Sequence, residues 1–430
     1  MYQITIESLY DAYFDTNRST KDMIPFSLRI DEEIYKLWQE LRCGTYEISR
    51  TKAFMVLSPK KREIFAMQPR DKIVNHWVRL RIEPLLETTY SNGCYSCRKG
   101  KGGTAFAQDA QAKMQEIINQ YGNCYVAHLD LRNFFMSIKR ELALRKTLEV
   151  VEMKYNGKDK DLLIFLLEKI LLYAPEKDFY ICGNPEDWNG YPKEKSLITN
   201  NPDEGLMMGS VNSQLVANLI LTATDKYIES LGISILRYVD DILLMHGDKD
   251  YLLRSISKVE QYIKDDTGMS LHKDKRYFQE ANKGVQIIGY VIRPDRLYIA
   301  NRCVGNLHKK IYAYNQLIRR KPKTAYKARQ RFLACINSYL GRIRGCRSYK
   351  IRRKAWENIS DSWKSMIYAV NLSKIVLYKP YKTQFTMPVR KVQGGYQWGK
   401  SGKVYPTKAQ AEKQGRAIYA SGYKGKPKKK

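Results

Sequence analysis

The fold of this chain is decided by residues 233–245, which read ISILRYVDDILLM. Apolar runs flank Asp240 and Asp241, and this pattern predicts a short β-hairpin with both carboxylates at its tip. Adjacent aspartates repel each other and are costly to bury unless a cation neutralises them. The hairpin therefore indicates a divalent metal site, and a solvated Asp-Asp turn is the alternative that this stretch alone leaves open.

A third carboxylate lies upstream, where Asp130 ends the apolar run at residues 125–129, a predicted buried strand. We expect Asp130, Asp240 and Asp241 to be catalytic and to hold two Mg²⁺ ions, for which Mn²⁺ can substitute. Leu131, next to Asp130, completes the predicted set of metal ligands. In a two-metal displacement one ion activates the attacking hydroxyl and the other stabilises the leaving group. Because Mg²⁺ takes few protein ligands and leaves positions for substrate phosphates, a sparse set of aspartates is sufficient.

Around these aspartates the sequence resembles the reverse transcriptases, over roughly residues 50–300. The resemblance implies an α+β right-hand polymerase that performs two-metal nucleotidyl transfer. It implies fingers with part of the palm at residues 1–120, the palm at 121–300, a helical thumb at 301–370 and a small basic extension at 371–430. We expect the segments 154–160 and 175–203 to be loop insertions within the palm, and residues 30–41 to form a helix of the fingers.

Residues 61–66 and 69–74 look like the fingers hairpin whose basic residues hold the incoming triphosphate. By this resemblance Arg62 and Arg70 are the candidate triphosphate ligands. Arginine suits the task because its planar fork can pair with two phosphate oxygens at once. Two surface arginines on a hairpin are the alternative.

Two more nucleotide contacts follow from the resemblance. Phe135, five residues after Asp130, is expected to lie against the sugar and to exclude a 2′-hydroxyl, which implies deoxynucleotide substrates. Residues 271–275 and 286–291 resemble the closing palm strands and place Lys275 near the triphosphate. A core aromatic and a solvated lysine are the respective alternatives.

The most discriminating segment is residues 205–214, GLMMGSVNSQ. Most reverse transcriptases have Gln-Gly here and Ser-Pro three residues later, whereas this chain has Met208-Gly209 and Ser213-Gln214. This departure, together with residues 95–102, YSCRKGKG, resembles the reverse transcriptases of diversity-generating retroelements, which copy a template RNA with frequent errors at adenines. A retron-like, defence-associated or group II intron reverse transcriptase is the enzymatic alternative. A non-catalytic RNA-binding scaffold is the alternative of another class.

Met208 offers a physical account of the errors. A glutamine beside the nascent pair supplies hydrogen bonds that hold base and sugar in register, whereas methionine supplies only flexible contact. Loss of one or two such bonds is worth ~1 to 3 kcal/mol, about 5- to 150-fold in discrimination. This loss does not account for selectivity toward adenine. Gln214, in the first turn of a helix predicted at residues 214–230, is a candidate for substrate positioning.

The formal net charge of +31 is unevenly distributed along the chain. Residues 1–300 hold 42 basic and 41 acidic groups, whereas residues 301–430 hold 33 basic and 3 acidic groups. Phosphate contacts gain from counterion release, so we expect the last third to bind a polyanion with steep salt dependence. Amphipathic helices at 301–370 are predicted to follow the RNA/cDNA duplex. The predicted nucleic-acid contacts there are Arg342, Arg344 and Arg347.

Residues 371–430 mix aromatic residues, glycines and lysines, with a short helix predicted at 407–419. Tyr396 and Trp398 are predicted to stack on single-stranded bases. A docking module for a protein partner remains open. The family resemblance also implies a template RNA, deoxynucleoside triphosphates and a small, basic, oligomeric accessory protein.

The remaining expectations concern cysteine, histidine and location. Cys94-x-x-Cys97 has no second pair at zinc spacing, so free thiols in a reducing compartment are expected. His128 shares a strand face with Asp130, where a packed or hydrogen-bonded role is expected. The sequence has neither a recognisable signal peptide nor an apolar stretch near the ~20 residues that span a bilayer. We therefore expect no membrane partner and a location in the cytoplasm of a bacterium, encoded by its chromosome or a phage.

Overall fold

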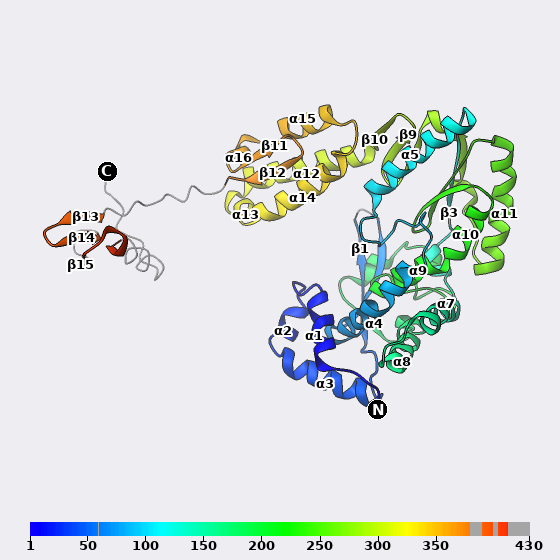
Figure 1. Cartoon of the computed structure of the whole chain (residues 1–430), viewed down its shortest axis with the longest axis horizontal. Coiled ribbons are helices and arrows are strands. Elements are labelled where there is room, and N and C mark those ends of the chain that lie inside the picture. Colours follow the sequence, from blue (N-terminus) through cyan, green and yellow to red (C-terminus); the bar gives the residue numbers. More distant parts are fainter. Residues whose placement is uncertain (59, 379–388, 399–402, 412–430) are drawn as a thin grey trace. The chain divides into compact units, whose positions relative to one another are not determined.

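The computed structural model describes residues 1–58, 60–378, 389–398 and 403–411, and the chain divides into two compact units. The first unit comprises Met1–Cys303 and Gly345–Ser348, and the second comprises Val304–Arg344 and Tyr349–Lys430. Figure 1 labels the elements of both units along the chain. The predicted catalytic aspartates all belong to the first unit.

Four helices and a small sheet form the N-terminal part of the first unit. The helices are α1 (Ile6–Asp15), α2 (Met23–Ser27), α3 (Ile30–Cys43) and α4 (Pro69–Glu87). The sheet has the order β2-β1-β4, from β1 (Thr51–Val56), β2 (Arg62–Ala66) and β4 (Phe179–Ile181). The helix predicted at residues 30–41 is confirmed by α3, which ends at Gly44 in the left-handed conformation that glycine adopts without strain. The predicted fingers hairpin is the antiparallel pair β1–β2.

The segment 175–203 differs from its prediction as a loop insertion within the palm. Its strand β4 pairs in parallel with β1, so part of the segment extends the fingers sheet. The buried carboxylate of Glu63 on β2 accepts hydrogen bonds from Trp188 Nε1 (2.8 Å), Ser196 Oγ (2.7 Å) and the Leu197 amide (2.7 Å). A buried carboxylate requires such donors, and they attach the segment to the fingers hairpin. Its short 3₁₀ turns are Pro175–Lys177, Pro185–Trp188 and Lys193–Lys195.

The predicted palm contains an antiparallel sheet of order β5-β6-β3-β7. Its strands are β3 (Tyr125–Asp130), β5 (Ser234–Tyr238), β6 (Asp241–His246) and β7 (Tyr277–Glu280). Ala127 and Leu129 on β3 and Leu244 on β6 are buried in one core with residues of α11, which covers that face. Because side chains alternate along a strand, His128 and Asp130 point to the opposite face.

The helices of the palm precede and follow these strands. They are α5 (Gly103–Tyr121), α6 (Phe134–Ser137), α7 (Arg140–Lys154), α8 (Lys160–Leu171), α9 (Val211–Ile220), α10 (Thr222–Ser230) and α11 (Lys249–Thr267). The single helix predicted at residues 214–230 is divided in two, because the chain leaves the helical conformation at Leu221 between α9 and α10. The 3₁₀ turns Lys273–Lys275 and Ala281–Lys283 lead to a second sheet of order β10-β9-β8. Its strands are β8 (Val285–Ile287), β9 (Tyr290–Arg293) and β10 (Arg296–Ile299).

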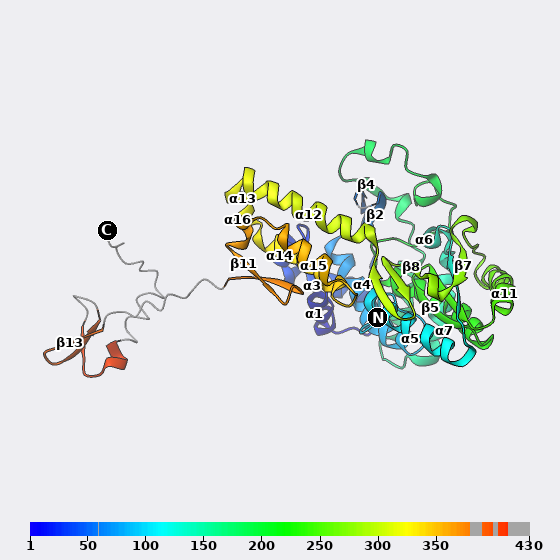
Figure 2. The ribbon, with the colours of Figure 1, turned by 90° about the horizontal axis from the view of Figure 1, so that it is seen from above.

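The second unit is mainly helical, as the thumb prediction expects. Its elements are α12 (Asn301–Arg320, whose first turn belongs to the first unit), α13 (Pro322–Lys327), α14 (Arg329–Ile343), α15 (Tyr349–Glu357), α16 (Asp361–Lys364), β11 (Ile367–Val370) and β12 (Lys374–Leu377). Helices α12 and α14 lie side by side (Figures 1 and 2), and the rings of Phe332 and Trp363 stack with centroids 4.2 Å apart. This aromatic pair, edge-on to Tyr314, forms the centre of the unit's core.

The described part of the C-terminal extension contains a three-stranded antiparallel sheet. Its strands are β13 (Val389–Val392), β14 (Gly395–Trp398) and β15 (Val404–Tyr405). Of the helix predicted at residues 407–419, the structure describes only its beginning, up to residue 411, and the rest lies outside the described residues. The hairpin β11–β12 spans residue 371, so the described structure continues without a break across the predicted boundary at 370/371, up to Leu377.

Two truncations test where the thumb ends. Removal of residues 371–430 deletes β12, whose Ile375 is buried and exchanges two 2.7 Å hydrogen bonds with Asn337 of α14. We expect this deletion to destabilise the second unit by about 2–4 kcal/mol, measured by thermal unfolding. The matched deletion of residues 379–430 keeps the hairpin and should leave the unfolding transition of that unit nearly unchanged. Equal destabilisation by both deletions would contradict this boundary.

Candidate active site

The predicted catalytic hairpin is formed by β5 and β6. Tyr238 pairs with Asp241, so Val239 and Asp240 make the two-residue turn between the strands. On the other side of β6, Asp241 pairs with Asp130, the last residue of β3. The register of two strand pairs thus gathers the three predicted aspartates at one end of the central strands.

Burial and mutual repulsion perturb this cluster. Burial, with repulsion from Asp241 and Asp130, raises the pKa of Asp240 to about 6. The Lys275 ammonium forms an ion pair with Asp130 Oδ2, and His128 Nε2 lies 2.8 Å from Asp241 Oδ1. The prediction of a hydrogen-bonded His128 is therefore confirmed. These contacts show a cluster whose negative charge is only partly compensated by the protein.

The residues present fit a hard divalent cation. Among the described residues, no group of three acidic, histidine or cysteine side chains is gathered closely enough to hold a metal by itself. The fit rests instead on the donor set: Asp241 pairs with Asp130, burial and these two carboxylates raise the pKa of Asp240, and Mg²⁺ binds to one or two such carboxylates and completes its shell with water and substrate phosphates. Leu131, whose side chain is buried, can offer only its backbone carbonyl. When bound, the metal would supply the charge that activates a hydroxyl and stabilises a leaving pyrophosphate.

The two predicted triphosphate arginines lie in different settings. Arg62 begins β2 and is exposed to solvent. Arg70, in the first turn of α4, pairs with Glu40 of α3 (Nη1 to Oε1, 3.2 Å) and lies 5.4 Å from the ring centroid of Tyr46. Arg62 is therefore available to a ligand as it stands, whereas Arg70 would have to exchange Glu40 for a phosphate.

The predicted sugar contact and the discriminating segment lie together. Phe135, half-buried on α6, accepts a 2.9 Å hydrogen bond at its carbonyl from the Leu206 amide. Met208 packs against a small apolar core that includes Phe65 of β2. A Cβ on Gly209 would lie 2.5 Å from the Phe65 carbonyl oxygen, so only glycine permits this approach to the fingers hairpin. The backbone contact explains why glycine follows Met208.

A buried amide that the sequence analysis did not identify holds the same segment. Asn75 of α4 accepts a hydrogen bond from Ser210 Oγ (2.8 Å), and Asn212 Nδ2 donates to the Asn75 carbonyl (3.0 Å). All three residues are buried. Nothing local in the sequence marks Asn75, because a buried and a solvated asparagine look alike in a helix.

The segment 95–102 and the start of α9 are directly connected. Cys97 Sγ donates to Gln214 Oε1 (3.0 Å), and Ser96 Oγ donates to Asn218 Oδ1 (2.6 Å). Asn218 Nδ2 returns a hydrogen bond to the Ser96 carbonyl (2.8 Å). The two segments that were distinctive in sequence, residues 95–102 and 205–214, are thus hydrogen-bonded to each other. All eight cysteines lie in the described ranges and are free thiols, as expected.

The predicted nucleic-acid contacts are distributed over both units. Arg342 and Arg344, at the end of α14, belong to the second unit, whereas Arg347 lies in the segment that belongs to the first; all three are exposed. The Arg347 amide donates to the Leu297 carbonyl on β10 (3.0 Å). Tyr396 and Trp398 are half-buried and alternate along β14, so they share one face of the extension's sheet.

A sheet with paired aspartates at the end of its central strands is the arrangement expected of a nucleic-acid polymerase palm. Residues 57–292 match the family described as "Reverse transcriptase (RNA-dependent DNA polymerase)", more than half of the chain. The chain therefore belongs to the reverse transcriptase family, and the predicted α+β right-hand polymerase fold is confirmed.

One curated relative is the "Putative COX1/OXI3 intron 1 protein" of Saccharomyces cerevisiae, 24% identical over 248 residues. The alignment covers 56% of this chain and 25% of that protein, so the chain spans about a quarter of its relative's length. Among solved structures, telomerase from Candida albicans with a TWJ fragment of telomeric RNA is 13% identical, with a TM-score of 0.41, over 78% of this chain and 63% of that one. Apo telomerase from Candida tropicalis is 11% identical, with a TM-score of 0.45, over 77% and 69%.

No helix of the described residues is both long and apolar enough to cross a membrane.

A double substitution tests the metal assignment. Asp240→Asn combined with Asp241→Asn removes two of the three charges that would hold Mg²⁺, so DNA synthesis should be abolished. RNA affinity, which depends on basic residues elsewhere, should remain nearly unchanged in a filter-binding titration. Synthesis at the wild-type rate by the double variant would remove these residues from the metal site.

The raised pKa of Asp240 predicts how stability responds to pH. A carboxyl with a higher pKa in the folded state is stabilising when protonated, so the metal-free protein should lose stability as pH rises from about 4 through about 6. The loss from this group should be about 2–3 kcal/mol, and Asp240→Asn should remove it. Mg²⁺ should raise the melting temperature more at pH 7.5 than at pH 5, since it competes with the proton. Identical pH profiles for wild type and Asp240→Asn in EDTA would contradict this prediction.

Proposed function

We propose that this protein is an RNA-directed DNA polymerase that makes error-prone, adenine-mutagenic cDNA from the template RNA of a diversity-generating retroelement. The polymerase part rests on the family match and on the aspartate cluster of β3 and β6. The finer assignment is supported by one observation above all. The two segments whose sequences resemble that subfamily, residues 95–102 and 205–214, are hydrogen-bonded to each other through Cys97 and Gln214.

The chemistry can be described residue by residue. Asp130, Asp240 and Asp241 would hold Mg²⁺, and Arg62 and Lys275 would supply positive charge to the triphosphate. Phe135 would occupy the space beside the sugar and select deoxynucleotides. Met208 would contact the nascent pair without hydrogen bonds, so that a mispaired base is rejected less strongly.

The partners follow from the charge and the family. The 33 basic and 3 acidic residues of positions 301–430 would hold the template RNA and the RNA/cDNA duplex. We also propose a small, basic, oligomeric accessory protein, and a bacterial cytoplasm, chromosomal or phage-encoded, as the place of action. Binding by Tyr396 and Trp398 of single-stranded bases remains part of the same proposal.

An intron-type reverse transcriptase is the second candidate, because the yeast relative is named an intron protein. The Met208-Gly209 and Ser213-Gln214 pairs favour the first candidate.

Sequencing of cDNA made on a primed RNA with all four bases distinguishes the two. We expect errors concentrated opposite template adenines, and Met208→Gln should reduce them by about 5- to 150-fold, since one or two hydrogen bonds to the nascent pair are restored. Met208→Leu is the matched control: it keeps an apolar side chain of similar volume, so the error spectrum should persist. Accurate cDNA from the wild-type protein would favour the intron-type or retron-like enzyme.

A further inference from the structure

The turn between β5 and β6 holds an unusual backbone conformation. Val239 has a φ of 61°, in the left-handed region that a β-branched residue rarely adopts. Two-residue hairpin loops usually place glycine or asparagine at such a position. A residue of this kind persists only where its surroundings hold it in place. The turn that carries Asp240 therefore depends on a restraint.

The Arg237 side chain provides that restraint. Its Nη1 donates to the Val239 carbonyl (3.1 Å) and to Asn218 Oδ1 (3.5 Å). Its Nη2 donates to the Asn218 carbonyl (3.1 Å) and to Asp225 Oδ2 (2.7 Å), and its Nε donates to Asp225 Oδ1 (2.8 Å). A guanidinium has five N–H groups, and these five hydrogen bonds use all of them. The arrangement requires arginine, since a lysine has only three donors.

The cation is buried together with its counterion. The side chains of Arg237 and Asp225 are both 0% exposed. Burial lowers the pKa of Arg237, but attraction to Asp225 outweighs this and raises it, so the guanidinium stays charged. A buried ion pair is often no more stabilising than apolar residues of similar volume. Stability alone therefore does not explain why a charged pair lies under the catalytic turn.

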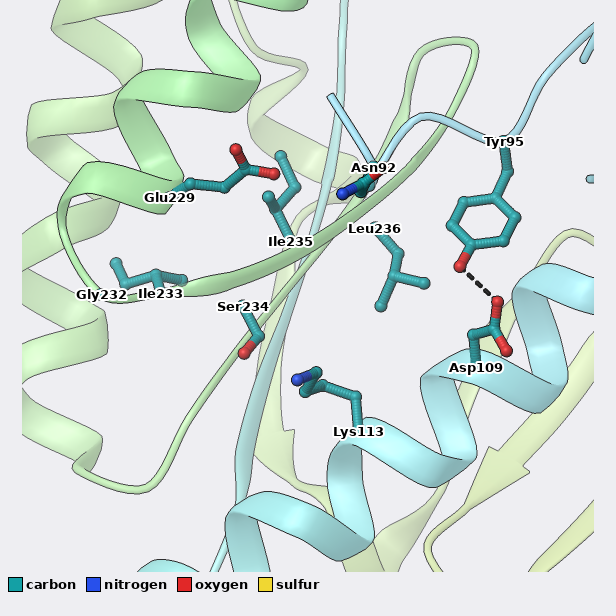
Figure 3. A pocket seen from close by; sticks show the side chains of 11 residues that line it. Asn92, Tyr95, Asp109, Lys113, Glu229, Gly232, Ile233, Ser234, Ile235 and Leu236 are labelled. Carbon is teal, nitrogen blue, oxygen red and sulfur yellow. Dashed lines mark hydrogen bonds between the residues drawn. The ribbon is translucent and has the colours of Figure 1, made fainter. Parts of the chain in front are cut away.

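The backbone of Arg237 is anchored to a second segment. Its amide donates to the Gly93 carbonyl (2.7 Å), and its carbonyl accepts from the Tyr95 amide (2.9 Å). Figure 3 shows this loop along the edge of β5, with the Tyr95 hydroxyl bonded to Asp109 of α5. A Cβ on Gly93 would lie 2.5 Å from the Ile235 carbonyl oxygen, so the close approach requires glycine. Arg237 is thus held at both its backbone and its side chain while it contacts the turn.

We propose that Arg237, fixed by Asp225, Asn218 and the loop at Gly93, is a positioning residue that holds the Val239 peptide so that Asp240 and Asp241 point to the metal site. This inference rests on the proposed DNA synthesis but not on the diversity-generating assignment. It predicts that loss of the restraint affects metal use and turnover, while substrate affinity and the fold are kept.

The main test replaces the pair by apolar residues, Arg237→Met with Asp225→Leu, so that no charge is left buried alone. On a primed homopolymer RNA, kcat should fall about 10- to 100-fold, with KM for the deoxynucleotide nearly unchanged. The Mg²⁺ concentration for half-maximal activity should rise, about 10-fold or more, as for other residues that orient metal ligands. The melting temperature should stay close to that of the wild type.

A second variant tests the proposal independently in case the first variant does not fold. Arg237→Lys keeps the charge opposite Asp225 but cannot make all five hydrogen bonds, so it should also lower kcat and raise the Mg²⁺ requirement. Adding Val239→Gly to either background should recover part of kcat, because glycine adopts a positive φ without strain. A residue with a merely structural role would not respond to a change at Val239.

The outcomes are distinct. Wild-type kcat and Mg²⁺ dependence in Arg237→Lys, or in a folded apolar pair, would overturn the positioning role. Failure of Val239→Gly to recover activity in a folded variant would also overturn it. An inactive wild-type protein on primed RNA would instead count against the proposed polymerase function.

Discussion

The pairing of β3 with β6 is the constraint on which the rest of the site depends. It sets Asp130 opposite Asp241 and, through β5, fixes where the turn with Asp240 begins. A shift of one residue in this ladder would turn the carboxylates toward the apolar core at α11. Ala127, Leu129 and Leu244 oppose such a shift, because it would replace their buried side chains in that core by charged ones. The apolar core therefore determines the position of the charges.

The palm contains two kinds of buried charge, and the protein treats them differently. Asp225 receives a full counterion in Arg237, with every donor of the guanidinium used. Among the described residues, Asp240 is paired with no buried counterion like Arg237, and burial beside two other carboxylates raises its pKa to about 6. A buried carboxylate whose charge is fully neutralised by hydrogen-bonded partners is held rigidly. A carboxylate whose charge is only partly neutralised favours binding of a cation. The two arrangements meet at the same turn, because Arg237 donates to the carbonyl of Val239, the residue before Asp240.

Local patterns in the sequence were sufficient for the elements that carry the chemistry. Apolar runs at residues 125–129 and 233–245 predicted the strands and the turn that carries Asp240, and α3 followed from helical spacing. Contacts between distant segments were not predictable in this way. The donors that reach Glu63 are separated from it by 125 to 134 positions in the sequence, and so the prediction of 175–203 as a loop insertion missed the pairing of β4 with β1. Asn75 and Arg237 were missed for the same reason, because their roles depend on partners that only the folded chain brings near.

The backbone of the segment at Met208 and the side chain of Met208 are held by different contacts. Its backbone is held by Gly209 against the Phe65 carbonyl and by Ser210 and Asn212 against Asn75. These contacts involve the neighbours of Met208, whose own side chain packs against a small apolar core. In the role proposed for Met208, an exchange between glutamine and methionine would alter the hydrogen-bonding surface offered to a base pair, while the backbone contacts of its neighbours would keep the loop in place. Under that proposal fidelity can vary because the geometry of the chain and the chemistry of the contact are set by different residues.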